Sequence, residues 1–232
     1  MTADDFLTLL RLPESAILRR RVTKTDFIDQ VHQSADRRLI TQRVESLTWL
    51  AAVNPDTTGL PAGEVDGLAV VAVGMRGDRA TPPPRLVQLL HRVVPDPMLL
   101  VSTRDRTVIT ISVKPYADGV FLIETIDEPP AAAAASLAVD RAASITELRD
   151  RWIDAVLGWA IHDAVGKFPV SRGDHQRRID KLAEIKRLDA QIKRDTPAAR
   201  RERQLARRAE LNATIQAARR HRQTIVEELV GT

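Results

Sequence analysis

The segment "EVDGLAVVAVGMRG", residues 64–77, decides the fold class of this chain. It is a continuous apolar run rich in valine, and it is shorter than the run of about 18 apolar residues that marks a membrane-spanning helix. A run of this length and composition predicts a strand that is buried on both faces of a sheet. With 232 residues, the chain is long enough to build a core around such a strand and to carry a further module.

Neighbouring segments extend this strand into a sheet. "VESLTWLAAV" (44–53) predicts a strand before it. "TPPPRLVQLLHRVV" (81–94) predicts an amphipathic helix that begins at Thr81 and is stopped by Pro95. Three more strands are predicted over residues 97–104, 107–116 and 119–126. This order of elements predicts an α+β fold, with a mixed or antiparallel five-stranded sheet that carries helices on one face.

The second half of the chain changes in character. Residues 1–128 form the predicted α+β body, and the Pro/Ala-rich stretch 129–143 is interpreted as a linker or a crossing segment. Residues 144–168 predict a helix that packs on the body. Ser144 and Glu147 form a capping box at its start, and Trp152 and Trp159 lie on its apolar side.

Residues 174–231 predict a basic, coiled-coil-like antiparallel helical hairpin. Thr196 followed by Pro197 is typical of a helix start, so the turn is expected at 195–196. A fold about this turn places Ile185 near Leu205 and Leu182 near Ala209, which predicts the seam of the hairpin.

The last helix also carries a second apolar line, which we call the heptad stripe. It lies roughly 140° around the helix from Leu205 and Ala209, at 100° per residue. An isolated hairpin of the predicted register leaves it in water, so it is expected to pack against the body, a second copy of the chain or a different protein. The candidate partner-binding residues of the stripe are Leu211, Ile215, Ala218, Ile225 and Leu229, with Arg222 as its one interruption.

Basic residues are concentrated in "AARRERQLARRAEL", residues 198–211, which we call the arginine strip. Three interpretations remain open: an ordinary solvated face, contact with phosphate, or contact with an acidic protein. Arginine far outnumbers lysine around the strip and binds phosphate through two parallel hydrogen bonds, which favours a backbone-led, salt-sensitive contact with DNA. The candidate nucleic-acid-binding residues are Arg200, Arg201, Arg203, Arg207 and Arg208.

The overall charge fits this division. Residues 1–150 hold 17 basic and 20 acidic side chains, a net of −3, whereas residues 151–232 hold 18 and 11, a net of +7. Such an asymmetry indicates an anionic partner for the basic half, or docking between the two halves. Cysteine is absent, which excludes disulfides and thiolate metal sites. We expect a cytoplasmic protein that neither enters a membrane nor needs a cofactor.

No catalytic motif is complete in the sequence. Pro95-Asp96 followed by "ISVK" (111–114) is similar to the acid-then-acid-x-Lys arrangement of metal-dependent nucleases, but the position two before Lys114 is Ser112. Glu64, Asp66 and Glu124 are further carboxylates near strand ends. We assign no catalytic residue and no metal ligand, and we keep a divergent Mg²⁺-dependent nuclease as an alternative.

Four stretches together give the chain a family likeness: "LPESAILRRRVTKTDF", "ESLTWLAAVNPDTTGLP", "VVPDPMLLVS" and "RERQLARRAELNATIQAARRHR". With them the chain resembles the bacterial domain-of-unknown-function family 4391 over almost its whole length. Such proteins are typically encoded beside helicases and adenine methyltransferases, so the resemblance implies a helicase or methyltransferase subunit as the partner. The resulting expectation is a non-catalytic accessory subunit of a restriction-like or antiviral DNA-defence complex. A self-assembling coiled-coil scaffold, such as a homodimer, is a further alternative.

Overall fold

The computed structural model describes residues 2–77, 82–102, 107–112, 121–126, 136–169 and 173–231. The chain divides into two compact units, Met1–Trp159 and Ala160–Thr232. The division falls within helix α7 (Ile145–Val165), which lies inside the range 144–168 predicted to be helical.

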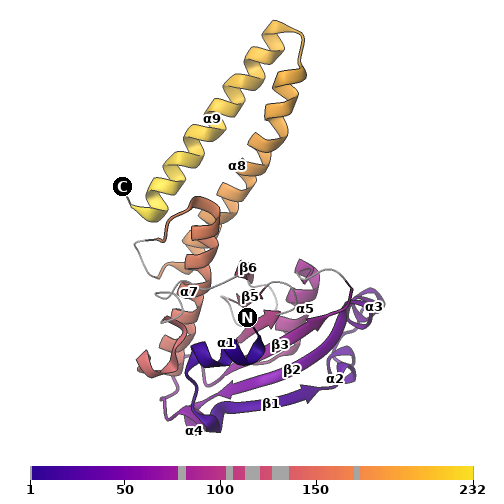
Figure 1. The fold of residues 1–232 in the computed structure, drawn as a ribbon, viewed down its shortest axis with the longest axis vertical. Helices are drawn as coiled ribbons and strands as arrows, with labels where there is room; N and C mark the ends of the chain where they lie inside the picture. The colour runs from indigo at the N-terminus through magenta and orange to yellow at the C-terminus, as the bar shows by residue number, and fades with distance from the viewer. Residues whose placement is uncertain are drawn as a thin grey trace. The chain divides into compact units, whose positions relative to one another are not determined.

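The first unit is built on a mixed sheet (Figure 1). The described strands follow the chain order from one edge to the other, and among them only the pair β3 and β4 is parallel. Helix α5 (Pro84–Val93) connects these two strands, as a parallel pair requires a crossover. The bounds are β1 Ile17–Val22, β2 Val44–Val53, β3 Leu68–Met75, β4 Met98–Ser102, β5 Thr107–Ser112 and β6 Phe121–Ile126.

The predicted α+β class with a mixed sheet is confirmed, and all five predicted strands are present as β2 to β6. The strand β1 joins them at the edge beside β2. Strand β3 is the predicted central strand, and its burial pattern shows that both of its faces are covered along most of its length.

The main core lies between one face of the sheet and three helices, α2, α3 and α5 (Figure 1). Phe27 of α2, Ile40 of α3 and Leu86 of α5 are buried against residues of β2, β3 and β4, among them Leu47 and Val71. Helices α2 and α3 span Lys24–Ile28 and Ser34–Arg43. The other short helices of this unit are α1 Ala3–Leu10, η1 Glu14–Ala16, α4 Pro55–Thr58 and η2 Val139–Arg141.

Two polar contacts tie helices of this unit in place. Arg85 of α5 makes a bidentate ion pair with Asp36 of α3, at 3.0 and 2.6 Å. The Arg85 hydrogen bond holds the pKa of the Asp36 carboxyl below its usual range, which keeps the carboxylate ionised where it is buried. The part of the predicted linker that is described, residues 136–143, contributes Leu137 to the core, and its carbonyl oxygen accepts a hydrogen bond from Nε1 of Trp152 at 2.8 Å.

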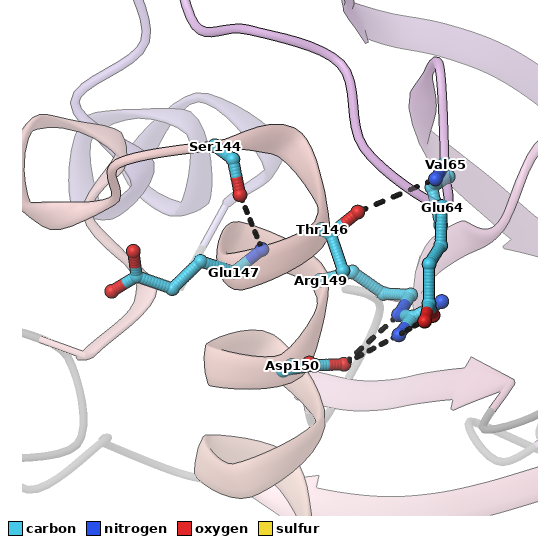
Figure 2. Close-up of polar contacts among 7 residues, drawn as sticks. All are labelled: Glu64, Val65, Ser144, Thr146, Glu147, Arg149 and Asp150. Carbon is cyan, nitrogen blue, oxygen red and sulfur yellow. Dashed lines mark hydrogen bonds and ion pairs between the residues drawn. The ribbon is translucent and has the colours of Figure 1, made fainter.

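Ser144 caps the start of helix α7, as predicted (Figure 2). The Glu147 backbone N–H donates to Oγ of Ser144 at 3.1 Å, and the Glu147 carboxylate accepts from the backbone N–H of Ala143 at 2.8 Å. These bonds satisfy donors that would otherwise be unpaired at the start of the helix. The predicted cap by Ser144 is therefore confirmed, but the return bond of a full capping box is not made to Ser144, because Glu147 accepts from Ala143, the residue before the cap.

The second unit contains the end of α7 and an antiparallel hairpin of α8 (His175–Arg201) and α9 (Leu205–Val230) (Figure 1). The prediction of a hairpin is confirmed, but the predicted turn at 195–196 is wrong. Helix α8 continues through Pro197, and the turn is Glu202–Gln204. Thr196 does not cap α9, because its hydroxyl donates to the carbonyl oxygen of Ile192 within α8, at 2.7 Å.

The later turn changes which face of α9 meets α8. Leu205, predicted to lie in the seam, is 72% exposed, and Ala209 is exposed too. The heptad stripe takes their place, because Ile215, Ala218, Ile225 and Leu229 are buried. Its arginine, Arg222, forms an ion pair with Asp189 of α8 at 2.6 Å. The expectation that the hairpin leaves this stripe in water is thus wrong.

Candidate nucleic-acid interface

The arginine strip occupies the turn end of the hairpin. It begins in the last turn of α8, passes through the turn and continues into the first two turns of α9. The five candidate nucleic-acid-binding arginines are all exposed: Arg200, Arg201, Arg203, Arg207 and Arg208. With Glu202 and Glu210 as its acidic residues, the strip carries a net charge of +3.

Glu202 is already engaged by the turn itself. Its carboxylate accepts from the backbone N–H of Gln204 at 2.9 Å and lies 3.5 Å from Nε of Arg207. The backbone hydrogen bond from Gln204, more than any other contact, holds the pKa of Glu202 below its usual range. Arg200, Arg201, Arg203 and Arg208 make no ion pair with any residue that the structure describes.

Towards the other end of the hairpin, two side-chain contacts join the helices. Lys181 of α8 lies 2.6 Å from the carboxylate of Glu228, and His221 of α9 lies 2.9 Å from that of Glu184. The His221 contact holds the pKa of Glu184 below its usual range. At the turn end, in contrast, Arg200, Arg201, Arg203 and Arg208 lie close together in the chain without an ion pair to a described residue.

A shallow hollow lies between the two helices at this end, and we call it the arginine hollow. Its volume is about 340 Å³. Arg200 comes from α8, whereas Arg208 and Arg219 come from α9, and the side chains of Asn212 and Gln216 line it between these two arginines. No acidic residue is among the side chains that line it.

The sequence analysis missed Arg219, Asn212 and Gln216, because they lie outside the strip. The spacing of Arg208 and Arg219 along the chain could have identified Arg219. Arg208 and Arg219 are eleven residues apart, which is close to three turns of an α-helix and places both on one face. Predicting the hollow also requires the correct position of the turn, because that position decides whether this face of α9 lies toward α8.

The candidate partner-binding residues lie within the hairpin. Ile215, Ala218, Ile225 and Leu229 are buried within the chain itself, at 3–6% exposure, and Leu211 is half-buried. These side chains stabilise the packing of α9. They do not form an open apolar surface for a second protein.

The candidate metal-binding carboxylates that the structure describes do not lie together. Glu64 lies 3.7 Å from Nη2 of Arg149, which also binds Asp150 (Figure 2). Asp96 is exposed beside Gly67. Lys114 and the side chains of Ser112 and Glu124 lie outside the described residues. Among the residues with a described position, no three His, Cys, Asp or Glu side chains are grouped so that they could hold a metal ion.

None of the described helices combines the length and the apolar character that are needed to cross a membrane. The longest, α8 and α9, carry charged residues along their whole length.

Comparisons with known proteins place the chain in a family. Neither the curated proteins nor the solved structures contain a significant match. A family model described as "Domain of unknown function (DUF4391)" matches residues 10–221, a range that includes most of the sheet-containing unit and most of the hairpin. Because this match covers most of the chain, the protein belongs to the domain-of-unknown-function family DUF4391.

Proposed function

We propose that this protein is a non-catalytic accessory subunit of a bacterial restriction-like or antiviral DNA-defence complex, acting in the cytoplasm, and that its arginine strip contacts the nucleic-acid backbone. The proposal that the strip binds nucleic acid rests on one observation. Four of its arginines are exposed at one end of the hairpin and make no ion pair with any described residue: Arg200, Arg201, Arg203 and Arg208.

The chemistry of the strip favours phosphate over base edges. Guanidinium groups bind phosphate oxygens in a bidentate manner, and neutralising several phosphates releases counterions. The strip lacks aromatic side chains and contains one amide side chain, Gln204, so it has little means to stack on bases or to distinguish them. The binding should therefore be insensitive to sequence and sensitive to salt.

The role as an accessory subunit is supported by the family membership and by the helicase and methyltransferase neighbours that the resemblance implies. The heptad stripe does not support a protein partner or a homodimer, because its side chains are already packed within the hairpin. A helicase or methyltransferase subunit would have to dock on another surface.

Two experiments test the proposal. Fluorescence anisotropy with labelled DNA duplexes of unrelated sequence should give similar affinities that fall steeply as the salt concentration rises. Co-expression with the proteins encoded beside the gene should give a complex of fixed stoichiometry. A monomer that binds neither DNA nor these proteins would refute the proposal.

A further inference from the structure

The arginine hollow offers more than a charged surface. We propose that it is a binding site for one backbone phosphate group of a nucleic acid, which Arg200, Arg208 and Arg219 would hold. This inference rests on the proposed function and narrows it, because it assigns the tightest contact to a defined recess and to a residue outside the arginine strip, Arg219.

The charges that line the arginine hollow favour an anion. Three guanidinium groups from two helices line one recess, and no acidic side chain lines it with them. None of the three makes an ion pair with a described residue. A concave surface lined by one sign of charge concentrates the field, so an anion gains more there than on a convex face. An anion in the hollow would also relieve the mutual repulsion of the arginines.

The hydrogen-bond donors that line the arginine hollow favour a phosphate group. A phosphate group offers several strong acceptor oxygens, and each guanidinium can donate two parallel hydrogen bonds to them. The amide groups of Asn212 and Gln216 line the same recess and are additional donors. A volume of about 340 Å³ is large enough for a phosphate group and several waters, since one water occupies about 30 Å³.

The surroundings favour a phosphate that belongs to a nucleic acid. Arg201, Arg203 and Arg207 are exposed on the same end of the hairpin but do not line the hollow. A polymer with a phosphate at each nucleotide can place one group in the hollow while its neighbours approach these outer arginines. A free phosphate ion can use only the hollow.

The test compares pairs of variants that change charge equally. In the full-length protein, Arg208→Gln with Arg219→Gln removes two charges from the hollow, whereas Arg201→Gln with Arg203→Gln removes two charges outside it. Arginine and glutamine have similar helix propensities, so both pairs should keep the helix content of the wild type by circular dichroism. Affinity for a labelled 20-base-pair duplex is measured by anisotropy at constant salt.

A second matched pair changes a single amide. Gln216→Glu places a carboxylate at the hollow, whereas Gln204→Glu places one in the turn outside it. If the hollow holds a phosphate, the hollow variant of each pair should bind the duplex about tenfold more weakly than its matched control. The arginine pair loses charge-assisted hydrogen bonds to the phosphate, and Gln216→Glu replaces an amide donor by a carboxylate that repels it. Inorganic phosphate at millimolar concentration should compete with DNA for the wild type but not for the Arg208→Gln, Arg219→Gln protein.

The outcomes separate the two claims. If the wild type binds DNA and the two variants of each pair lose the same amount of DNA affinity, the phosphate-binding site is refuted and the proposed function still stands. A wild-type protein without affinity for DNA would overturn both. The phosphate-binding site would also be refuted if inorganic phosphate still competed with DNA for the Arg208→Gln, Arg219→Gln protein.

Discussion

Arg222 of α9 donates hydrogen bonds to both carboxylate oxygens of Asp189 in α8, at 2.6 and 3.2 Å. Its Nη2 atom also donates to the carbonyl oxygen of Ala164 in the last turn of α7, at 3.0 Å. The arginine that interrupts the heptad stripe thus helps to fix the register of the two long helices, together with the Lys181–Glu228 and His221–Glu184 contacts. Polar residues at seam positions of coiled coils have the same effect, because only one register satisfies them.

The Arg222 contact predicts a localised loss of stability. Arg222→Ala should destabilise the hairpin by about 1 kcal/mol, a low value for charged hydrogen bonds because the Asp189 side chain is partly exposed. Hydrogen exchange of the α8 and α9 amides measures the effect. Arg220→Ala is the control, since Arg220 is exposed on the same helix and its side chain has no ion pair with a described residue. Equal exchange in the two variants would contradict the assignment.

Two buried tryptophans provide a second test. Nε1 of Trp152 donates to the carbonyl oxygen of Leu137, whereas Nε1 of Trp159 is buried without a partner among the described residues. Trp152→Phe should therefore destabilise the protein by about 1–3 kcal/mol more than Trp159→Phe, because it leaves a buried carbonyl without a donor. Urea denaturation monitored by circular dichroism gives both values. A larger loss for Trp159→Phe would show that the hydrogen bond contributes little.

The buried His91 predicts a dependence of stability on pH. Burial lowers the pKa of His91 to about 3, and its Nε2 lies 3.0 Å from Oγ1 of Thr110. Because the pKa is lower in the folded state than in the unfolded state, the contribution of neutral His91 is complete above about pH 6.5 and is lost as the pH falls toward 3. The loss reaches at most about 1.4 kcal/mol per pH unit.

The variant His91→Gln isolates this effect, because glutamine can still bond to Thr110 but does not titrate in this range. Between about pH 6.5 and pH 4 its free energy of unfolding should fall less than that of the wild type. Chemical denaturation at several pH values measures the difference. Parallel pH profiles would show that His91 is not the titrating group.

The approach of the loop 61–67 to α7 gives a steric prediction. A Cβ atom on Gly63 would lie 2.5 Å from Oγ1 of Thr146, which accepts a hydrogen bond from the backbone N–H of Val65 (Figure 2). Gly63→Ala should therefore displace the Thr146 side chain and cost about 1–2 kcal/mol. In Gly67→Ala the new Cβ would be 3.5 Å from its nearest neighbour, so this control should be close to neutral. Equal melting temperatures for the two variants would exclude the close contact.

The sequence was sufficient for the central strands because their burial leaves a strong pattern. Residues 68–75 are apolar on both faces, and β2 and β4 are similarly rich in buried residues. The edge strand β1 was not predicted because four of its six residues are exposed and three of them are arginines. Charged edge strands prevent pairing with other chains, and they lack the apolar alternation that identifies a strand.

The hairpin shows where local rules misled the prediction. Thr196-Pro197 is a favourable start for a helix, but α8 continues through both residues to Arg201, so the turn lies about two helical turns later than predicted. A later turn shifts the pairing along α9 and rotates the face that meets α8, so the heptad stripe became the seam and Leu205 became exposed. The arginine strip was found from composition alone, whereas the arginine hollow depends on this register.

The central claim is that the arginine strip binds nucleic acid through its phosphates, and the salt dependence of DNA affinity tests it most directly. The variant carries Arg200→Glu, Arg201→Glu, Arg207→Glu and Arg208→Glu. The control carries Arg20→Glu, Arg21→Glu, Arg38→Glu and Arg92→Glu, four exposed positions of the first unit with the same change of charge. The account predicts weak binding by the strip variant and a flatter plot of log affinity against log salt, with the slope reduced by about 0.9 for each phosphate that the protein no longer neutralises. An unchanged affinity and slope in that variant, or an equal loss of affinity in the control, would contradict it.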